Sequence, residues 1–289
     1  PGFGEDDYVL GQKEGLPALC PIDEDCRFTA EVPDFEGEFV KDTDTPIIRR
    51  LRDSGQLFSE GSINHSYPFC WRCDSPLIYR AVTTWFVKVG QIKDKLAGAN
   101  QQIWWIPEHI KDGRFGKWLE GARDWAISRN RYWGTPLPVW RNDETGETVC
   151  VGSREELERH CGQTIDDLHK HHVDRIELPG ANGHGTLRRV PEVLDCWFES
   201  GSMPYGQSHY PFENKEQFDR NFPADFISEG LDQTRGWFYT LTVLAAALFD
   251  KPAFKNCIVS GMLLAEDGRK MSKRLKNYPE PTEMMDTYG

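Results

Sequence analysis

Two short stretches of the sequence carry side chains that could bind a phosphorylated ligand. Residues 229–233, Glu-Gly-Leu-Asp-Gln, supply two carboxylates and an amide next to a glycine. Residues 269–274, Arg-Lys-Met-Ser-Lys-Arg, follow Gly268 and hold four cations and one hydroxyl. Carboxylates accept hydrogen bonds from a ribose diol, and lysine ammonium groups suit phosphate oxygens. Phosphate binding is the functional interpretation of residues 269–274, whereas a basic run taken alone is more often a solvated loop.

The elements around these stretches predict how they come together. Residues 224–228 and 256–260 are short apolar strand candidates, and the apolar run 237–249 between them predicts a buried helix with an acidic cap within 232–235. Two strands joined through such a helix should lie parallel, with a right-handed crossover. Ligands of such α/β sheets bind outside the carboxyl ends of the strands. We therefore expect both stretches at one edge of a parallel sheet.

Three blocks of the sequence resemble class I aminoacyl-tRNA synthetases. Residues 270–274, Lys-Met-Ser-Lys-Arg, are similar to the Lys-Met-Ser-Lys-Ser signature of that family, a loop that stabilises the pyrophosphate leaving group when ATP activates an amino acid. Residues 229–238 and 195–201 resemble the corresponding blocks of isoleucyl-tRNA synthetases, and valyl and leucyl relatives differ at both. Arg274 in place of serine, followed by Asn277-Tyr278-Pro279, is similar to the eukaryotic-type branch, which some bacteria also carry.

The resemblance implies the second half of a Rossmann-like catalytic domain. The other ATP-binding signature of the family, His-x-Gly-His, does not occur in the sequence, and the chain starts at Pro1 without a methionine. We therefore expect an internal fragment that lacks the N-terminal half of the catalytic domain and is inactive alone. The implied segments are the end of an editing domain at 1–66, a connective segment at 67–138, a connective insertion at 139–190 and the catalytic half-domain at 191–289.

The resemblance also assigns roles to individual residues. Isoleucine and ATP would form isoleucyl-adenylate, with Mg²⁺, and the isoleucyl group would pass to tRNA(Ile). The catalytic residues would be Lys270, Ser272 and Lys273, which hold the departing pyrophosphate. The residues that bind ATP and the adenylate would be Glu229, Gly230, Asp232, Gln233 and Lys273. Trp197 and Trp237 would form two walls of the isoleucine pocket, with ordinary core packing as the alternative.

Asp7 is the one residue that the resemblance connects with editing. Pro1, Gly4 and Asp7 fit the later positions of an Ala-Pro-x-x-Gly-x-x-Asp pattern in which the aspartate anchors the amino group of a mischarged amino acid such as valine. An acidic helix start is the other interpretation of Glu5-Asp6-Asp7. Editing is needed because one methylene distinguishes valine from isoleucine by only ~1–3 kcal/mol.

Two alternatives to the isoleucine enzyme stay open. A valyl-type synthetase would share the basic loop, and a non-catalytic, synthetase-derived module would bind RNA or protein. The net charge of -12 argues against a nucleic-acid surface over the whole chain, so tRNA would bind local basic patches such as 123–131 and 270–276.

Composition sets the remaining limits. The sequence has no apolar window near the ~18 residues that a membrane span needs. Eight cysteines at irregular spacing do not resemble a secreted disulfide framework, so we expect a cytoplasmic protein, and a monomer.

Metal binding has weak support in the sequence. Cys70 and Cys73 have the spacing of a zinc knuckle, which is half a zinc site at most, and packed or free thiols are the commoner case. The histidines of the insertion lack paired-ligand spacing, so solvated histidines are expected there. They are His160, His169, His171, His172 and His184.

The flanks of the catalytic segment carry further expectations. Residues 81–128 have a helical, aromatic pattern that is more often core than a base-stacking platform. Residues 193–198 are a strand candidate ending near Trp197, and Trp133-Gly134 predicts a tight turn. Arg129 and Arg131 could touch the tRNA acceptor end, although a structural salt bridge is the more ordinary role.

Overall fold

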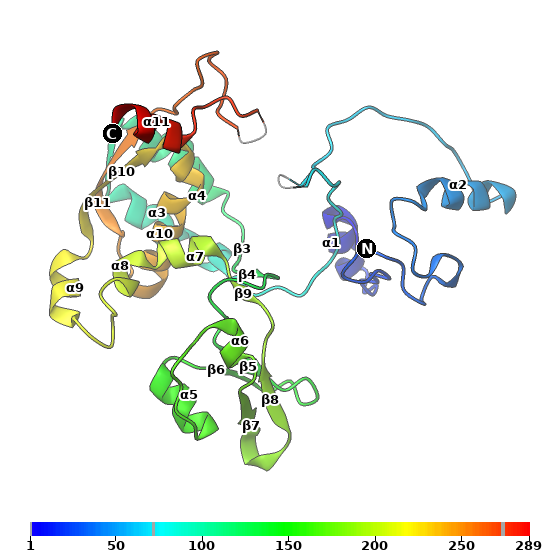
Figure 1. Ribbon diagram of the computed structural model, residues 1–289, viewed down its shortest axis with the longest axis horizontal. Helices are drawn as coiled ribbons and strands as arrows, with labels where there is room; N and C mark the ends of the chain where they lie inside the picture. Colours follow the sequence, from blue (N-terminus) through cyan, green and yellow to red (C-terminus); the bar gives the residue numbers. More distant parts are fainter. Residues whose placement is uncertain (1, 71–72, 273–274) are drawn as a thin grey trace. The chain divides into compact units, whose positions relative to one another are not determined.

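The computed structural model covers residues 1–289 and describes all of them except residues 1, 71–72 and 273–274, with the side chain of Asn182 also left out. The chain forms two compact units, Pro1–Thr83 and Thr84–Gly289. Figure 1 traces each unit along the sequence. The finer boundaries expected at 66, 138 and 190 stay predictions.

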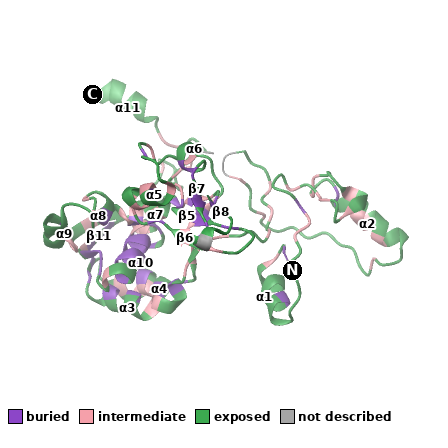
Figure 2. Cartoon of the chain, turned by 90° about the horizontal axis from the view of Figure 1, so that it is seen from below, coloured by how far each residue is buried: buried purple, intermediate pink, exposed green. Residues whose placement is uncertain are grey.

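The first unit contains little regular structure. Its helices are α1 (Glu5–Lys13), η1 (Pro33–Phe35) and α2 (Asp44–Asp53). Single antiparallel bridges, such as Ile22 to Phe28, tie its loops together. Figure 2 shows that most residues of α1 and α2 are exposed, and α2 has no buried residue. Hydrophobic burial therefore contributes little to this unit.

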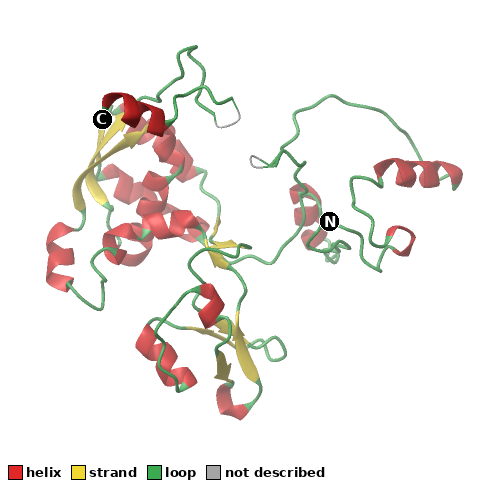
Figure 3. Ribbon diagram, viewed as in Figure 1, coloured by secondary structure: helices red, strands yellow, loops and turns green. Residues whose placement is uncertain are grey.

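The central feature of the second unit is a three-stranded parallel sheet in the order β10, β11, β2. Its strands are β10 (Ala224–Gly230), β11 (Phe254–Ser260) and β2 (Trp104–Ile106). Helix α10 (Trp237–Phe249) connects β10 to β11, as Figure 3 shows. The expected strand, helix and parallel strand are therefore confirmed. Strand β2 corrects the expectation of a helical pattern over residues 81–128, because three of these residues extend the sheet.

An aromatic core fills the space between α10 and the sheet. Every residue of α10 from Phe238 to Ala246 is buried. Trp105 of β2 packs against Phe115, Phe238 and Phe254, with ring centroids 4.8, 5.9 and 6.0 Å away. The Nε1 of Trp105 donates to Oδ1 of Asn100 at 2.9 Å, so this large side chain is buried without an unpaired donor.

Short elements on either side complete this body. They include η2 (Val89–Ile92), α3 (Lys93–Gln101), η3 (Lys111–Phe115) and α4 (Gly116–Glu120). Three more helices follow in α8 (Met203–Gly206), α9 (Lys215–Asn221) and η5 (Leu231–Arg235). Strands β1 (Phe86–Val87) and β3 (Trp125–Ala126) pair antiparallel, and α11 (Pro281–Tyr288) ends the chain. None of the helices in the described part of the chain is long and apolar enough to cross a bilayer.

Residues 139–189 build a separate antiparallel sheet in the order β6, β5, β8, β7. Its strands are β5 (Val139–Arg141), β6 (Thr148–Cys150), β7 (Glu177–Pro179) and β8 (Thr186–Arg189). Its helices are α5 (Arg154–Cys161), α6 (Lys170–Val173) and η4 (Ala181–Gly183). Trp140, Leu157, Leu178 and Leu187 belong to its own small core. This segment can therefore hold its shape through its own packing.

The strand expected over residues 193–198 is confirmed for its first two residues and wrong for the rest. Strand β9 contains only Val193–Leu194 and pairs antiparallel with β4 (Ser128–Arg129), outside the parallel sheet. Helix α7 (Cys196–Gly201) begins directly afterwards. The change of direction occurs at Asp195, whose side chain is only 4% exposed and forms an ion pair with Arg129.

Candidate active site

The carboxyl edge of the parallel sheet brings three chain segments together. Gly230 at the end of β10 lies beside Ser260 at the end of β11, and Ile258 of β11 lies beside Ile106 at the end of β2. The chain therefore leaves the sheet at one edge in three places. Glu229 and Gly230 lie at the first, residues 261–280 begin at the second, and the exposed Glu108 and His109 follow the third. Sequence analysis missed Glu108 and His109, because nothing in their neighbourhood predicts β2.

The backbone turn after β10 holds Asp232 close to the strand end. A Cβ atom at position 230 would lie 2.7 Å from Oδ1 of Asp232, so glycine makes room for this carboxylate. The Nε2 of Gln233 donates to Oδ2 of Asp232 at 2.9 Å. Glu229 and Asp232 are both exposed. The structure thus brings together the four residues Glu229, Gly230, Asp232 and Gln233. They present two accessible carboxylates, and the amide of Gln233 orients that of Asp232.

The expected acidic cap of α10 is wrong. The cap position is Gly236, and Oε1 of Gln233 accepts a hydrogen bond from the backbone N–H of Trp237 at 3.0 Å. The 3₁₀ turn η5 separates Asp232 from the helix start, so the amide of Gln233, three residues before the cap, satisfies the N–H that a carboxylate was expected to take. Asp232 keeps its remaining lone pairs for a ligand.

A buried hydroxyl fixes η5 from beneath. Thr234 is fully buried, its Oγ1 donates to the carbonyl of Leu231 at 2.8 Å, and it accepts from Nε of Arg114 at 2.9 Å. The guanidinium of Arg235 lies over the ring of Trp118, 5.0 Å from its centroid. Arg114 comes from η3, far away in sequence, and no motif singled it out. These contacts attach the carboxylate turn to the aromatic core.

Trp197 and Trp237 both lie where α7 meets α10. A Cβ atom at position 236 would be 3.0 Å from Cη2 of Trp197, so this ring covers Gly236. The Nε1 of Trp237 donates to the carbonyl of Ser200 at 3.0 Å. Trp197 is 40% exposed. It lies in helix α7 and not at the end of a strand, where the sequence had placed it. The two rings therefore border the same helix contact, next to the carboxylate turn.

Arg129 has the structural salt bridge that sequence analysis expected as its ordinary role. Its Nη2 lies 3.0 Å from Oδ2 of the buried Asp195, and the indole Nε1 of Trp125 donates to the same oxygen at 3.2 Å. This group fixes the start of α7, and with it Trp197. Contacts of Arg129 and Arg131 with tRNA stay a prediction.

The basic loop is organised by local bonds. Leu264 and Lys270 form an antiparallel bridge across a turn at Gly268, whose φ of 75° favours glycine. The guanidinium of Arg269 donates to Asp267, which holds the pKa of the Asp267 carboxyl below its usual value. Lys270 is exposed. No hydrogen bond or ion pair joins Lys270 to Glu229, Asp232 or Gln233 within the described residues, so their action on one ligand stays a prediction.

Asn277 is a loop residue whose role sequence analysis missed. Its Oδ1 accepts from the backbone N–H of Ser272 at 2.9 Å, and its Nδ2 donates to the carbonyl of Lys270 at 3.3 Å. One amide thereby holds the backbone on both sides of Met271. Lys273, expected to be catalytic and to bind ATP, lies outside the described residues, as does Arg274.

Two further sequence predictions fall in the first unit. Asp7 lies exposed in the first turn of α1, with Glu5 and Asp6, so the acidic helix start is confirmed and the editing role stays a prediction. The Cys73 thiol bonds to the Ser75 hydroxyl at 3.3 Å, and this bond lowers the pKa of Cys73. Within the described residues, no third metal-ligating side chain joins Cys70 and Cys73.

The chain belongs to the class I tRNA synthetases (I, L, M and V), whose family model matches residues 20–289. Among curated relatives, the isoleucine--tRNA ligase of Treponema denticola is 66% identical over all 289 residues, which cover 26% of that protein. The isoleucine--tRNA ligase of Chlamydia trachomatis serovar D is 62% identical over the whole chain and 28% of its own length. The chain thus spans about a quarter of the length of these relatives.

A solved structure of methionyl-tRNA synthetase from Mycobacterium tuberculosis, bound by methionyl-adenylate, aligns with the whole chain and 53% of its own length. The sequence identity is 16% and the TM-score 0.46. The match is weak, and the family assignment does not depend on it.

Proposed function

We propose that this chain is the part of an isoleucine--tRNA ligase that binds the aminoacyl-adenylate. The observation that carries the proposal is the 66% identity with the Treponema denticola isoleucine--tRNA ligase over all 289 residues. The two relatives named above are both isoleucine--tRNA ligases, which favours isoleucine over valine as the amino acid. The carboxylate turn at the sheet edge supports the same function, because strand ends of this kind bind nucleotides.

The proposed reaction has two steps, and neither step forms a covalent bond between the substrate and the enzyme. The isoleucine carboxylate attacks the α-phosphate of ATP, forms isoleucyl-adenylate and releases pyrophosphate. A terminal hydroxyl of tRNA(Ile) then attacks the acyl carbon, takes the isoleucyl group and releases AMP. The protein contributes positioning and charge stabilisation. Mg²⁺, when bound, would offset phosphate charge, and exposed carboxylates are the oxygen donors that it prefers.

Each residue of the edge has a proposed task in this reaction. Glu229 and Asp232 accept hydrogen bonds from the ribose hydroxyls, Gln233 keeps Asp232 in place, and Gly230 lets the ligand approach the backbone. Lys270 and Ser272, with Lys273 outside the described residues, hold the departing pyrophosphate. Since Lys270 is exposed and held by local bonds, it can reach the phosphate without disturbing the sheet.

The tryptophans are proposed to select the amino acid. Trp197 and Trp237 border the helix contact beside Asp232, and two indole faces make an apolar slot for a branched side chain. Such a slot rejects valine only partly, because one methylene is worth ~1–3 kcal/mol. Asp7 is proposed to take part in hydrolysis of mischarged valine, within an editing domain that includes parts of the relatives' length beyond this chain.

The proposal is tested with the full-length enzyme by isoleucine-dependent exchange of pyrophosphate into ATP. Lys270→Ala should lower kcat by ~10²–10³, the cost of removing one preorganised group that stabilises developing charge. Lys255→Ala is the matched control, because Lys255 lies at the amino end of β11 and pairs with Asp225 at 2.8 Å. Equal activity of both variants would contradict the site.

A second measurement tests which amino acid the enzyme prefers. The wild-type enzyme should favour isoleucine over valine in kcat/KM, and Trp197→Ala should reduce that ratio while pyrophosphate exchange continues. A wild-type preference for valine would support the valyl alternative. Absence of exchange with either amino acid would support a non-catalytic module.

A further inference from the structure

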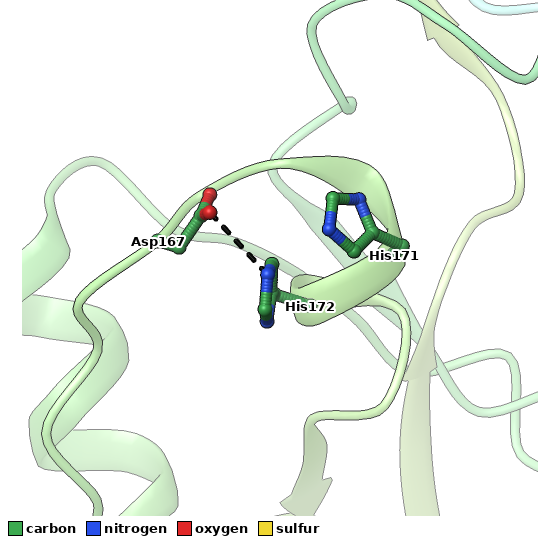
Figure 4. Close-up of side chains that lie close together, drawn as sticks. All are labelled: Asp167, His171 and His172. Atoms are coloured by element: carbon green, nitrogen blue, oxygen red, sulfur yellow. Dashed lines mark ion pairs between the residues drawn. The ribbon is translucent and has the colours of Figure 1, made fainter.

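Three metal-ligating side chains converge in the insertion, away from the sheet edge. Figure 4 shows Asp167 together with His171 and His172 on the short helix α6. One ligand atom from each residue lies within 4.8 Å of the others, and within the described residues this is the only such group of three. His169, His171 and His172 are exposed, as sequence analysis expected. Asp167 brings two of these histidines to one point, and the sequence pattern did not indicate it.

Asp167 is held in place by a fourth residue. Its Oδ1 accepts from the backbone N–H of His169 at 2.7 Å and lies 2.6 Å from Nδ1 of the same histidine. These two bonds fix the orientation of the Asp167 carboxylate. Its second oxygen, Oδ2, faces Nε2 of His172 at 3.3 Å. The carboxylate therefore points one oxygen toward the histidine pair.

The two histidines lie close together although they are adjacent in sequence. Their ring centroids are 4.2 Å apart at an interplanar angle of 47°. Neighbouring residues of a regular helix do not face each other, but α6 is only four residues long. The nearby cation is already paired, because Lys170 bonds to Asp174 at 2.5 Å. Two imidazoles and one carboxylate thus share a small volume, and the ammonium group of Lys170 beside them is occupied by Asp174.

The backbone around the group is fixed while the ligand atoms face solvent. Ile165 and Val173 flank the group on either side and are buried in the core of the insertion. Trp133 stacks on His169 with ring centroids 5.3 Å apart. The side chains can rotate inward, which a metal requires, since ligand atoms around tetrahedral zinc lie about 3.3 Å apart for bonds of ~2.0 Å.

We propose that Asp167, His171 and His172 bind one divalent ion of the zinc class, with water in the fourth position and His169 orienting Asp167. Imidazole nitrogens suit zinc, cobalt and nickel, whereas magnesium and calcium prefer oxygen ligands alone. A carboxylate held by a histidine hydrogen bond has the supporting contact typical of metal sites. The ion would connect the segment 165–169 to α6 and stabilise the insertion. The proposal is independent of synthetase activity.

Cobalt titration of the 289-residue chain under reducing conditions tests the site. We expect visible d–d absorption that saturates at one Co²⁺ per chain, is displaced by Zn²⁺ and lacks a sulfur-to-cobalt charge-transfer band. The double substitution H171A/H172A should weaken binding by at least ~100-fold, and His169→Ala by ~10–100-fold, as for residues that orient a ligand. His184→Ala, an exposed histidine of the same insertion, should leave binding unchanged.

The same titration separates this site from the cysteine pair. A thiolate charge-transfer band that disappears in C70S/C73S, with unchanged binding in H171A/H172A, would overturn the proposal. Binding only at millimolar Co²⁺, or equal loss in His184→Ala, would overturn it as well. Thermal unfolding gives an independent readout: Zn²⁺ should raise the Tm of the wild-type chain but not that of H171A/H172A, because an ion bound only to the folded state stabilises it.

Discussion

The two halves of the proposed adenylate site are built in different ways. The carboxylate turn at 229–233 rests on a buried threonine, an arginine from η3 and the aromatic core around Trp105. Most described residues of the basic loop, 261–272 and 275–278, are exposed, and the turn at Gly268 and the side chain of Asn277 hold its backbone. One half is positioned by packing, the other by hydrogen bonds within itself.

The difference matches what each half has to do. Ribose hydroxyls are present in both substrate and adenylate, so the groups that bind them gain from being rigid before the ligand arrives. Pyrophosphate leaves after the first step, so the groups that hold it must also release it. A loop whose described contacts are local hydrogen bonds can change position at a low free-energy cost, because none of these contacts belongs to the core.

The strongest test of this comparison removes the support of the carboxylate turn. Trp105→Ala should lower the free energy of unfolding by ~3–5 kcal/mol, because it empties a fully buried ring site. Trp104→Ala is the control: Trp104, the residue next to Trp105 in β2, is 69% exposed, so its loss should change stability by no more than ~0.5 kcal/mol. Urea unfolding followed by circular dichroism measures both. Similar losses in the two variants would refute a core behind the turn.

Thiol reactivity tests the same core through Cys257 of β11. Burial raises the pKa of Cys257 to about 12, and only thiolates react with iodoacetamide. At pH 8 we expect Cys257 to be labelled at least ~1000-fold more slowly than the exposed Cys150, measured by peptide mass spectrometry. The difference should vanish in urea. Because the folded-state pKa lies above the ordinary 9.0, stability should also fall as pH rises from 9 toward 12.

A smaller effect is expected where α7 approaches α10. A Cβ atom at Gly201 would lie 3.0 Å from Cβ of Thr240 and 3.1 Å from Cδ1 of Leu244. Gly201→Ala should therefore cost ~1–3 kcal/mol by overpacking. Gly98→Ala in α3 has open space around it and should stabilise the protein by ~0.5–1 kcal/mol. Urea unfolding measures both variants. If the free energy of unfolding changes in the same direction in both, the helix contact that positions Trp197 is not tight.

The smallest effect is expected in the loop. Asn277→Ala should change global stability by no more than ~0.5 kcal/mol, since no core contact is lost. The Ser272 amide should nevertheless exchange its hydrogen ~2–10-fold faster, the equivalent of one hydrogen bond. The Gly268 amide, which donates to Ala265, should be unaffected and serves as the internal reference. Faster exchange at both amides would mean that Asn277 organises the whole loop.

The central part of the fold was predictable because its pattern is local. The apolar run 237–249 coincides with α10, and the flanking strand candidates lie within β10 and β11. Strand β2 was not predictable, because its three residues pair only with a strand far along the chain. The apolar run after Val193 suggested a longer strand, but Asp195 is drawn inward by Arg129 and Trp125 and the chain turns into α7.

The site was predictable as a set of residues and less so as a set of contacts. Glu229, Gly230, Asp232 and Gln233 lie together at the expected edge, but which side chain satisfies the start of α10 depends on the 3₁₀ turn between them. Arg114 and Asn277 act on backbone or hydroxyl groups, so no charge pattern marks them. Asp167 could not be predicted as part of a cluster, because His171 and His172 come close to it only when α6 turns back over the preceding segment.

Gln233 joins two parts of the proposed site that are assigned to different ligands. Its Nε2 binds the carboxylate of Asp232 and its Oε1 binds the N–H of Trp237, so one amide group spans the sugar side and the amino-acid side. Any shift of Asp232 that keeps both bonds must carry the first turn of α10 with it. If these residues have the proposed roles, a single side chain mechanically links recognition of the nucleotide to the fit of the amino acid.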